Sequence, residues 1–537
     1  MHQRYSVTKK ILILHDLSVG SRGTNRDHLY NFSKYEKGNF YLYHCAHAPV
    51  TDELKAIGFD GVIINYCFLG YRAGLLYAAL KQKYAWLRDL SCPKIAICQD
   101  DYTDSGILDE WLDYMKVTTI YSPIQDGVDK LYPLNWGKKR FKLGLTAYTD
   151  NAQLTKLAKC RTPFKKRKVD VGTRVRYLPP QFGRYGRIKG ESAEDFRDAA
   201  DVAGFETDIS TDPRDVIFGS DWLKFMGNCK FTLGSKGGSS LNDPQGKLRH
   251  KIANYLIKNP DAGFAEVEKK CFPGLDGIHI FAGVSPRLFE AAALKTCQIL
   301  IRDEYIGGIE EYIDYIPLDE DLSNIEEVFE LMRDDEKCMA MVESCYNKLI
   351  ATNKFDYSNF VPDVLSEIKA SKHGITQTDI NHINKHFAAL APYQNVRSKI
   401  GGFYERLWRR VIANAVYVDS PEYICSTFQL PAELSSCFSA VLYLQESDCR
   451  STNIEFSADM LAMCRYIQAD TDDLKQISEL AVKNDYTYED LETWWDMCEY
   501  IYEPAKINKP RLRSKSPIKK PPLAPKKTKT RKPKKVV

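Results

Sequence analysis

The sequence predicts an α/β protein with two doubly wound, Rossmann-like domains, a C-terminal helical extension and a disordered basic tail. Two series of short apolar runs that alternate with helical patterns lead to this prediction, between residues 10 and 121 and between 169 and 333. Strands that alternate with helices form parallel sheets covered on both faces. The tail is predicted from composition, because residues 510–537 contain twelve Lys or Arg, no acidic residue and frequent proline.

Length and composition favour several packed domains. The chain has 537 residues, of which 44% are hydrophobic and 12% aromatic, enough for large cores. We expect one sheet domain over residues 1–160, a second over 161–370, a helical domain over 371–505 and the tail over 506–537. No run of 18 apolar residues occurs, so we expect no transmembrane helix.

Charge and cysteine usage narrow the class of protein. The net charge is +4, and subtracting the twelve tail cations leaves about −8 for residues 1–509. The 15 cysteines are scattered, with no CxxC pair and no Cys/His cluster at zinc spacing. We therefore expect reduced thiols in a cytoplasmic protein that has no structural metal.

The first series places polar residues at the carboxyl ends of its strands. Strands are predicted at 10–15, 39–44, 59–65, 93–99 and 117–121, with helices at 27–35, 75–90 and 107–115. Ligands of doubly wound folds bind at these strand ends, where His15, Asp100 and Asp101 lie. Each is a candidate general base. The alternatives are helix capping for the two aspartates and a structural role for the histidine.

The second series predicts another sheet of the same kind. Its strands are predicted at 169–174, 207–210, 230–234 and 298–301, with helices at 192–204, 220–228, 247–259, 263–270 and 325–333. A loop is predicted at 237–246. Near 342–355 we expect the chain to return to the first domain.

The segment Ser285-Pro-Arg287-Leu-Phe-Glu290-Ala-Ala-Ala carries the strongest functional signal. It predicts a short helix that leads into the strand at 298–301. The spacing of three puts Arg287 and Glu290 on one helical face. An arginine at a helix start suits a phosphate group, and a carboxylate one turn later accepts hydrogen bonds from sugar hydroxyls. The alternative is a buried helix with a salt pair at its entrance.

A loop after the strand at 169–174 is rich in cations and glycine. Arg174, Arg184, Arg187 and Lys189 are candidates for binding a diphosphate. A solvated basic loop is the alternative. The later loop at 234–240 contains Lys236 but lacks the ending of a P-loop, so we do not expect an ATPase.

The pattern Arg287-x-x-Glu290-Ala-x-Ala before an apolar strand resembles the donor-binding motif of GT-B glycosyltransferases, especially the CgeB-like and group 1 families. The resemblance implies that Ser285, Arg287 and Glu290 bind a nucleotide-sugar donor, and that the four cations before them contact its diphosphate. The family places a second glutamate at the position of Gln298, which can bond a ribose hydroxyl without a charge. The resemblance also implies that no metal and no cofactor is needed beyond the donor, whose base is unknown.

The implied function is transfer of a sugar to a hydroxyl of a glycan, lipid or protein acceptor bound by the first domain. The alternative is a catalytically silent GT-B-like binding or scaffolding protein tethered by its tail, favoured by Gln298 and Lys236. The tail suits an anionic membrane surface or another polyanion, or it only aids solubility. No sequence-specific nucleic-acid motif is present. The expected location is cytoplasmic, with peripheral attachment to a membrane as an option.

Overall fold

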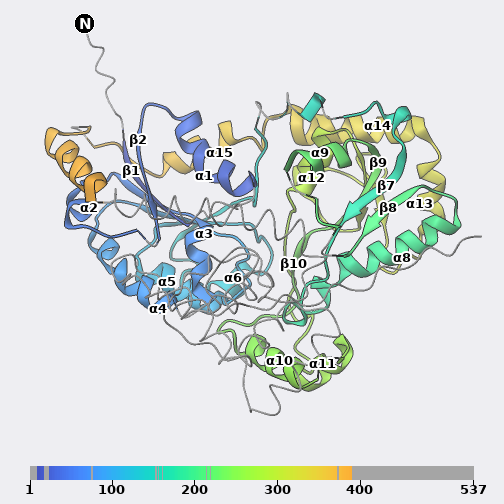
Figure 1. Ribbon diagram of the computed structural model, residues 1–537, viewed down its shortest axis with the longest axis horizontal. Helices are drawn as coiled ribbons and strands as arrows, with labels where there is room; N and C mark the ends of the chain where they lie inside the picture. The colour runs from blue at the N-terminus through green and yellow to red at the C-terminus, as the bar shows by residue number, and fades with distance from the viewer. Residues whose placement is uncertain are drawn as a thin grey trace, which may run out of the picture. The chain divides into compact units, whose positions relative to one another are not determined.

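The computed structural model describes residues 9–389, apart from 17–22, 47, 74–75, 151–153, 155–156, 160, 213–214, 218, 260 and 372–373. Two parallel sheets lie within this part of the chain (Figure 1). The predicted helical domain beyond residue 389 and the predicted disordered tail lie outside the described residues.

The first sheet has six parallel strands in the order β2-β1-β3-β4-β5-β6. This is the 2-1-3-4-5 order of doubly wound folds with one strand added, and its switch point lies between β1 and β3. The strands are β1 (Lys10–His15), β2 (Phe40–Cys45), β3 (Gly61–Ile64), β4 (Lys94–Ile97), β5 (Thr119–Ser122) and β6 (Arg140–Leu143). The helices are α1 (Gly23–Tyr35), α2 (Asp52–Ala56), α3 (Tyr66–Leu69), α4 (Leu76–Lys83), α5 (Ser105–Tyr114) and α6 (Val128–Leu131).

Side chains of β1 show why both faces of this sheet need helices. Successive residues of a strand point to opposite faces. Ile11 and Ile13 pack in one core with residues of α1, whereas Leu12 and Leu14 pack in another with residues of α3 to α6. All four side chains are fully buried, which explains the unbroken apolar run in the sequence.

The second sheet has five parallel strands in the order β13-β12-β9-β7-β8. Counted within this domain, the order is again 2-1-3-4-5, with the switch point between β7 and β9. The strands are β7 (Val169–Arg174), β8 (Thr207–Ser210), β9 (Cys229–Gly234), β12 (Cys297–Ile301) and β13 (Ile316–Leu318). The helices are α8 (Ile188–Val202), α9 (Gly219–Met226), α12 (Arg287–Ala293), α13 (Ile325–Met332) and α14 (Asp335–Tyr346). The prediction of two doubly wound sheets is confirmed.

An insertion separates β9 from α12. Its ends, β10 (Gly237–Ser239) and β11 (Phe281–Gly283), pair antiparallel, and α10 (Lys247–Lys258) and α11 (Phe264–Cys271) lie between them in sequence. A Cβ at Gly238 would lie 1.9 Å from the carbonyl oxygen of Phe281, so this pairing requires glycine. The loop predicted at 237–246 is therefore wrong at its start, because glycines that permit close strand contact resemble those of a turn.

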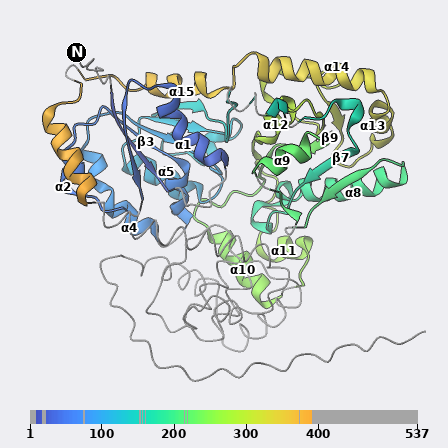
Figure 2. The same ribbon diagram turned by 45° about the horizontal axis from the view of Figure 1, so that its top comes forward.

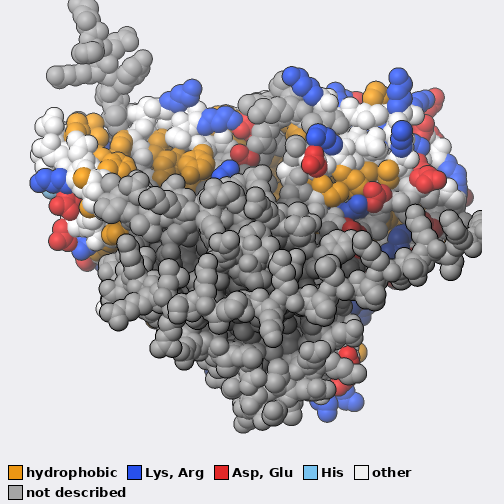
Figure 3. Space-filling view, in the orientation of Figure 1, with side chains coloured by type: hydrophobic (Ala, Val, Ile, Leu, Met, Phe, Trp, Pro, Cys, Tyr) orange, Lys and Arg blue, Asp and Glu red, His pale blue; other side chains and the backbone are white. Residues whose placement is uncertain are grey.

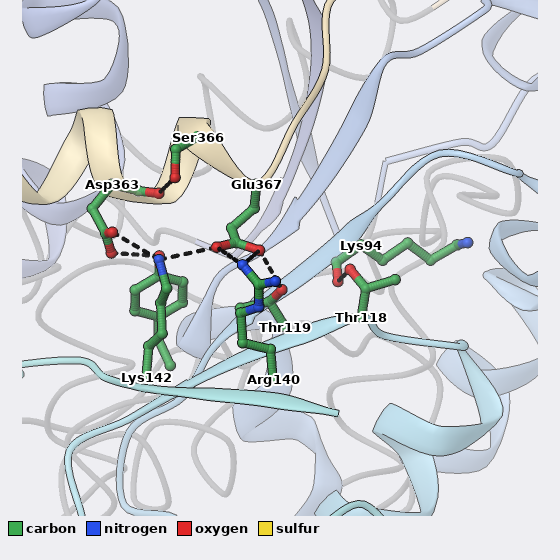
Figure 4. A network of polar contacts seen from close by, with 9 residues as sticks. Lys94, Thr118, Thr119, Arg140, Lys142, Asp363, Ser366 and Glu367 are labelled. Atoms are coloured by element: carbon green, nitrogen blue, oxygen red, sulfur yellow. Dashed lines mark hydrogen bonds and ion pairs between the residues drawn. The ribbon is translucent and has the colours of Figure 1, made fainter. Parts of the chain in front are cut away.

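The chain returns to the first sheet through α15 (Tyr357–Ser366). Figure 4 shows the polar side of this contact. Lys142 of β6 pairs with Asp363 at 2.7 Å and with Glu367 at 3.0 Å, and Arg140 pairs with Glu367 at 3.0 Å. The predicted second domain, 161–370, thus ends with a helix that packs on the first sheet.

Residues 377–389 form a helix beside α2, drawn in orange in Figures 1 and 2. Lys10 Nζ and Asp379 Oδ2 form a buried ion pair of 2.8 Å. Thr51, which caps α2, lies 3.0 Å from Nδ1 of His386. The start of the predicted helical region therefore packs as part of the first domain.

The described surface carries both signs of charge. In the view of Figure 3, basic and acidic side chains are intermixed where the described residues are visible. Within the described ranges, no helix is long and apolar enough to span a membrane.

Candidate functional site

A pocket lies at the switch point of the second sheet, where β7 and β9 end. Val175 follows β7, Gly234 ends β9 and Ser235 follows it, and Ile301 ends β12. Its polar lining includes four residues predicted as site residues, namely Lys189, Ser285, Arg287 and Gln298. The fold rule that places ligands at switch points thus leads to the same pocket as the sequence motif.

Arg287 begins α12 and reaches back to the end of β7. Its Nη2 donates to the carbonyl oxygen of Arg174 at 2.7 Å, and its Nη1 donates to Oγ1 of Thr173 at 3.3 Å. Burial lowers the pKa of the guanidinium, and the charge of Glu290 opposes this shift. Arginine stays protonated regardless, so Arg287 contributes a fixed positive charge to the pocket lining.

Lys189 lies in the first turn of α8 and lines the pocket together with Arg287 of α12. Burial and then the positive charge of Arg287 lower its pKa to about 7. Among the described residues, no carboxylate pairs with its ammonium group. The position of a Cβ at Gly237 would be 3.1 Å from Nζ, so glycine leaves room for the lysine there. Two cations without a shared counter-ion therefore line one pocket.

Glu290 faces Trp222 of α9 rather than forming a direct ion pair with Arg287. The indole Nε1–H donates to Oε2 of Glu290 at 2.9 Å. The guanidinium carbon of Arg287 lies 4.9 Å from the centre of the Trp222 ring. Burial raises the pKa of Glu290, while the indole hydrogen bond and the charge of Arg287 oppose that rise.

Gln298 and Thr232 are paired in register on β12 and β9, and both line the pocket. The Nε2 of Gln298 donates to the carbonyl oxygen of Leu288 at 3.2 Å, which fastens α12 to the sheet. A glutamate at this position could not donate that bond when ionised. Thr232 is 1% exposed, and its Oγ1 has no hydrogen-bond partner within the described part of the chain.

Ser285 and the three other predicted cations differ in placement. Ser285 lines the pocket, and its Oγ accepts from the backbone N–H of Arg287 at 3.4 Å. Arg174 pairs with Asp208 at 2.7 Å, and Arg187 pairs with Glu191 at 2.8 Å. Arg184 is exposed. Of the predicted basic loop, the pocket lining includes only Lys189.

Lys236 lies beside the pocket but is neutralised. Its Nζ pairs with Asp303 Oδ1 at 2.8 Å, which joins the loop after β9 to the loop after β12. The hydroxyl of Tyr185 lies 3.4 Å from the other oxygen of Asp303. Lys236 therefore differs from Lys189, for whose charge the described part of the chain offers no such partner.

The two aspartates after β4 have different environments. Asp101 is fully buried, and its Oδ2 accepts from Ser122 Oγ and Tyr132 Oη, each at 2.6 Å. Burial raises its pKa to about 6 despite these hydrogen bonds. Asp100 is exposed, has a positive φ of 51° and accepts from the hydroxyl of Tyr102 at 2.9 Å. Only Asp100 is therefore accessible to a ligand.

His15 ends β1 and is partly exposed. Its ring meets that of Tyr43 edge-on, with centroids 6.4 Å apart. The next residue, Asp16, accepts hydrogen bonds from Cys45 and Tyr71. In the described ranges, no group of three or more His, Cys, Asp or Glu is arranged to hold a metal ion.

Sequence reasoning missed Trp222 and Asp303. Trp222 lies within the helix predicted at 220–228, and nothing in that helix distinguishes a ligand-site tryptophan from one that fills a core. Asp303 lies two residues after the strand predicted at 298–301, and no local pattern marks it as a partner of Lys236. Their contacts with Glu290 and Lys236 join residues 68 and 67 positions apart, beyond the reach of local patterns.

Comparisons with known proteins give only weak likenesses. No family model and no curated protein matches the sequence. Three solved structures resemble this chain, and each match covers 67% of it. Anabaena Alr3699/HepE in complex with UDP-glucose is 11% identical, is covered over 100% of its own length and gives a TM-score of 0.37. An alpha-glucosyltransferase in complex with UDP and a 13-mer DNA is 13% identical with a TM-score of 0.40, and T4 phage BGT in complex with its UDP-glucose substrate is 11% identical with a TM-score of 0.39, each covered over 99% of its length. Likeness at this level carries no argument about the chemistry of this chain, whose fold is defined by its own strand orders.

Proposed function

We propose that the chain is a GT-B glycosyltransferase, as its resemblance to the CgeB-like and group 1 families implies, which moves a sugar from a nucleoside-diphosphate donor to a hydroxyl group. The observation that carries the proposal is the pair of cations, Lys189 and Arg287, in one pocket at a switch point. A diphosphate would supply the counter-charge that Lys189 lacks among the described residues. The same two cations would stabilise the charge that develops on the departing diphosphate.

Two further residues suit the uncharged parts of a nucleotide sugar, namely Thr232 of the pocket lining and Glu290, which lies outside that lining but one turn from Arg287 on α12. Glu290 is held by one indole hydrogen bond, and a carboxylate has further acceptor sites for sugar or ribose hydroxyls. Thr232 offers a buried hydroxyl that has no hydrogen-bond partner among the residues that the structure describes. In the transfer, the acceptor oxygen bonds to the anomeric carbon, the bond to the diphosphate oxygen breaks, and a base takes the hydroxyl proton. Asp100 is the accessible candidate for that base. The burial of Asp101 argues against Asp101 in this role.

Donor binding is the direct test. We expect one of UDP-, GDP-, ADP- or CDP-glucose to raise the unfolding temperature, because a ligand that binds only the folded state stabilises it. Arg287→Ala should weaken the binding of that ligand by roughly 1.5–3 kcal/mol, the contribution of a hydrogen bond to a charged group. Arg88→Ala is the matched control, since Arg88 is exposed and stacks on Tyr114 in the first domain. If no nucleotide sugar binds, the proposal is wrong.

A silent binding protein is the second candidate, favoured by the burial of Asp101 and by the Lys236–Asp303 pair. Slow donor hydrolysis separates the two. A transferase should release nucleoside diphosphate from the bound donor, and Glu290→Gln should reduce that rate while the protein stays folded. Binding without any hydrolysis or transfer would favour the silent protein.

We also propose that no metal is needed for turnover. The support is the cation pair, which would supply the charge that a metal supplies to a diphosphate in metal-dependent enzymes. Turnover should therefore survive EDTA. Complete loss that manganese restores would contradict this part of the proposal.

The basic tail is proposed to attract an anionic surface and to be unnecessary for chemistry. Deleting residues 510–537 removes twelve cations and none of the pocket residues. We expect the truncated protein to turn over a small acceptor like the parent but to bind anionic vesicles less. For the parent, that binding should fade as salt rises from about 0.1 M to about 1 M, where the screening length falls from about 10 Å to about 3 Å. Equal vesicle binding by both proteins would exclude the tail as the attachment.

A further inference from the structure

Trp222 contacts both charged residues of α12. The face of its ring lies against the guanidinium of Arg287, with 4.9 Å between the guanidinium carbon and the ring centre. The edge of the same ring donates the Nε1 hydrogen bond of 2.9 Å to Glu290. One side chain from α9 therefore lies against two residues that are one turn apart on α12.

This arrangement differs from the one expected for an arginine and a glutamate three residues apart. Such a pair are neighbours on the helix surface and tend to form a direct ion pair. Here the side-chain hydrogen bonds of Arg287 go to Thr173 and to the carbonyl of Arg174, and that of the Glu290 side chain comes from Trp222. Arg287 thus remains part of the pocket lining instead of being neutralised beside it.

We propose that Trp222 is a positioning residue of the nucleotide-sugar site, holding Arg287 through its ring face and Glu290 through its N–H so that the two charges act separately on one ligand. The inference rests on the proposed function. A ring face attracts a cation, while an indole N–H stabilises an ionised carboxylate as acceptor. Trp222 would therefore fix the position of Arg287, which contacts the diphosphate, and keep Glu290, which contacts the sugar, ionised.

Two substitutions separate the two contacts. Trp222→Phe keeps an aromatic face for Arg287 but removes the donor to Glu290, and Trp222→Leu removes both. The matched controls are Trp136→Phe and Trp136→Leu, since Trp136 is 46% exposed and its ring lies at a tilt against that of Phe141 in the first domain. Unfolding temperature is measured for every variant, so that misfolding is recognised.

Inorganic pyrophosphate probes the anion contact by itself. At pH 8 we expect Trp222→Phe to bind it within about threefold of the parent, and Trp222→Leu at least tenfold more weakly. The sugar contact is probed with whichever of UDP-, GDP-, ADP- or CDP-glucose gives the largest thermal shift. Its affinity should fall at the acid end as Glu290 becomes protonated, and the midpoint of that fall should move up by at least half a pH unit in Trp222→Phe.

The shift in midpoint is the result that packing alone would not produce. Removing the N–H donor disfavours the charged carboxylate, so the pKa of Glu290 should rise. In Glu290→Gln the acid fall should be absent, and adding Trp222→Phe to that variant should change nothing further. A folded Trp222→Leu that binds pyrophosphate like the parent, or an unmoved midpoint in Trp222→Phe, overturns the positioning role alone. A parent that binds neither pyrophosphate nor any of the four sugars refutes the proposed function, and the positioning role with it.

Discussion

Lys189 and Arg287 line the same pocket, and the charge of Arg287 adds to the effect of burial in lowering the pKa of Lys189 to about 7. Near neutral pH the lysine is therefore partly deprotonated when the pocket is empty. An anion between the two cations would favour the protonated form. Binding of a diphosphate and uptake of a proton should be linked.

The first prediction concerns this linkage. Pyrophosphate affinity should fall as pH rises from about 7 to 9, by up to tenfold per pH unit for one linked proton. Calorimetry in buffers of different ionisation enthalpy measures the proton taken up directly. Lys189→Arg should bind with little dependence on pH over this range, because a guanidinium stays charged.

Two further variants test the origin of the effect. Lys189→Met should weaken pyrophosphate binding at pH 7 and remove the proton uptake. Lys165→Met should do neither, because Lys165 is exposed. Proton uptake that persists in Lys189→Met would assign the titration to another group.

The second prediction concerns Asp101. Its folded pKa of about 6 lies above the ordinary value of 3.8, so the folded state binds more protons than the unfolded state between about pH 4 and 6. Its contribution to stability therefore falls as pH rises through this window, by roughly 3 kcal/mol for a shift of about two units. Asp101→Asn removes this penalty but keeps an oxygen for Ser122 and Tyr132. Relative to the parent, it should be more stable at pH 8 than at pH 4.5.

Urea unfolding at the two pH values checks this difference. The control is Asp89→Asn at an exposed position, which should change the free energy of unfolding by the same amount at both pH values. Asp101→Ala should lose about 1–3 kcal/mol at either pH, because it leaves two buried hydroxyls without their acceptor. An Asp101→Asn variant whose relative stability does not change with pH would disprove the raised pKa.

The third prediction concerns the network of Figure 4. Glu367 accepts from Thr119 Oγ1 and Arg140 Nη1, each at 3.0 Å, and pairs with Lys142. Burial would raise its pKa, but these partners outweigh it and lower the pKa. Glu367→Gln should therefore cost about 1–3 kcal/mol at pH 7.

The cost should shrink as pH falls below about 4.5, because a carboxylate with a lowered folded pKa contributes stability only while it is ionised. Urea unfolding between pH 7 and pH 4 measures the trend. Glu304→Gln, at an exposed position, is the control. A loss that is the same at every pH would mean that shape, rather than charge, holds α15 on the sheet.

The fourth prediction concerns the buried pair Lys10–Asp379. Burial would raise the pKa of Asp379, but hydrogen bonds from Lys10 and Thr376 lower it to about 2. Asp379→Asn leaves the Lys10 ammonium buried without its counter-charge, and it should cost about 3–5 kcal/mol in thermal or urea unfolding. The double variant Lys10→Met/Asp379→Leu should be closer to the parent than either single variant. Equal losses in the single and double variants would show that the ion pair is not what the two residues contribute.

Strand prediction from sequence succeeded for the buried strand β1, for the half-buried strand β7 and for the edge strand β8, of which only Ile209 is buried. The predicted strands at 10–15, 169–174 and 207–210 coincide with β1, β7 and β8. The sequence did not predict β6, because Arg140-Phe-Lys-Leu143 lies at the sheet edge and is largely exposed or half-exposed. Its basic residues, Arg140 and Lys142, bind Glu367 and Asp363, which lie more than 200 residues later in the chain.

The sequence by itself determined the two α/β series, the helix start at Arg287 and the spacing of Arg287 and Glu290, because these depend on periods of two and 3.6 residues and on neighbours a few positions apart. Tertiary structure alone decided which predicted cations keep an unpaired charge. Arg174 meets Asp208 and Lys236 meets Asp303, whereas Lys189 meets no carboxylate among the described residues. It also decided that Asp101 is buried while Asp100 is exposed, and that Trp222 reaches Glu290. The reason is that the state of a charge depends on burial and on partners brought together from distant parts of the chain, which no local pattern records.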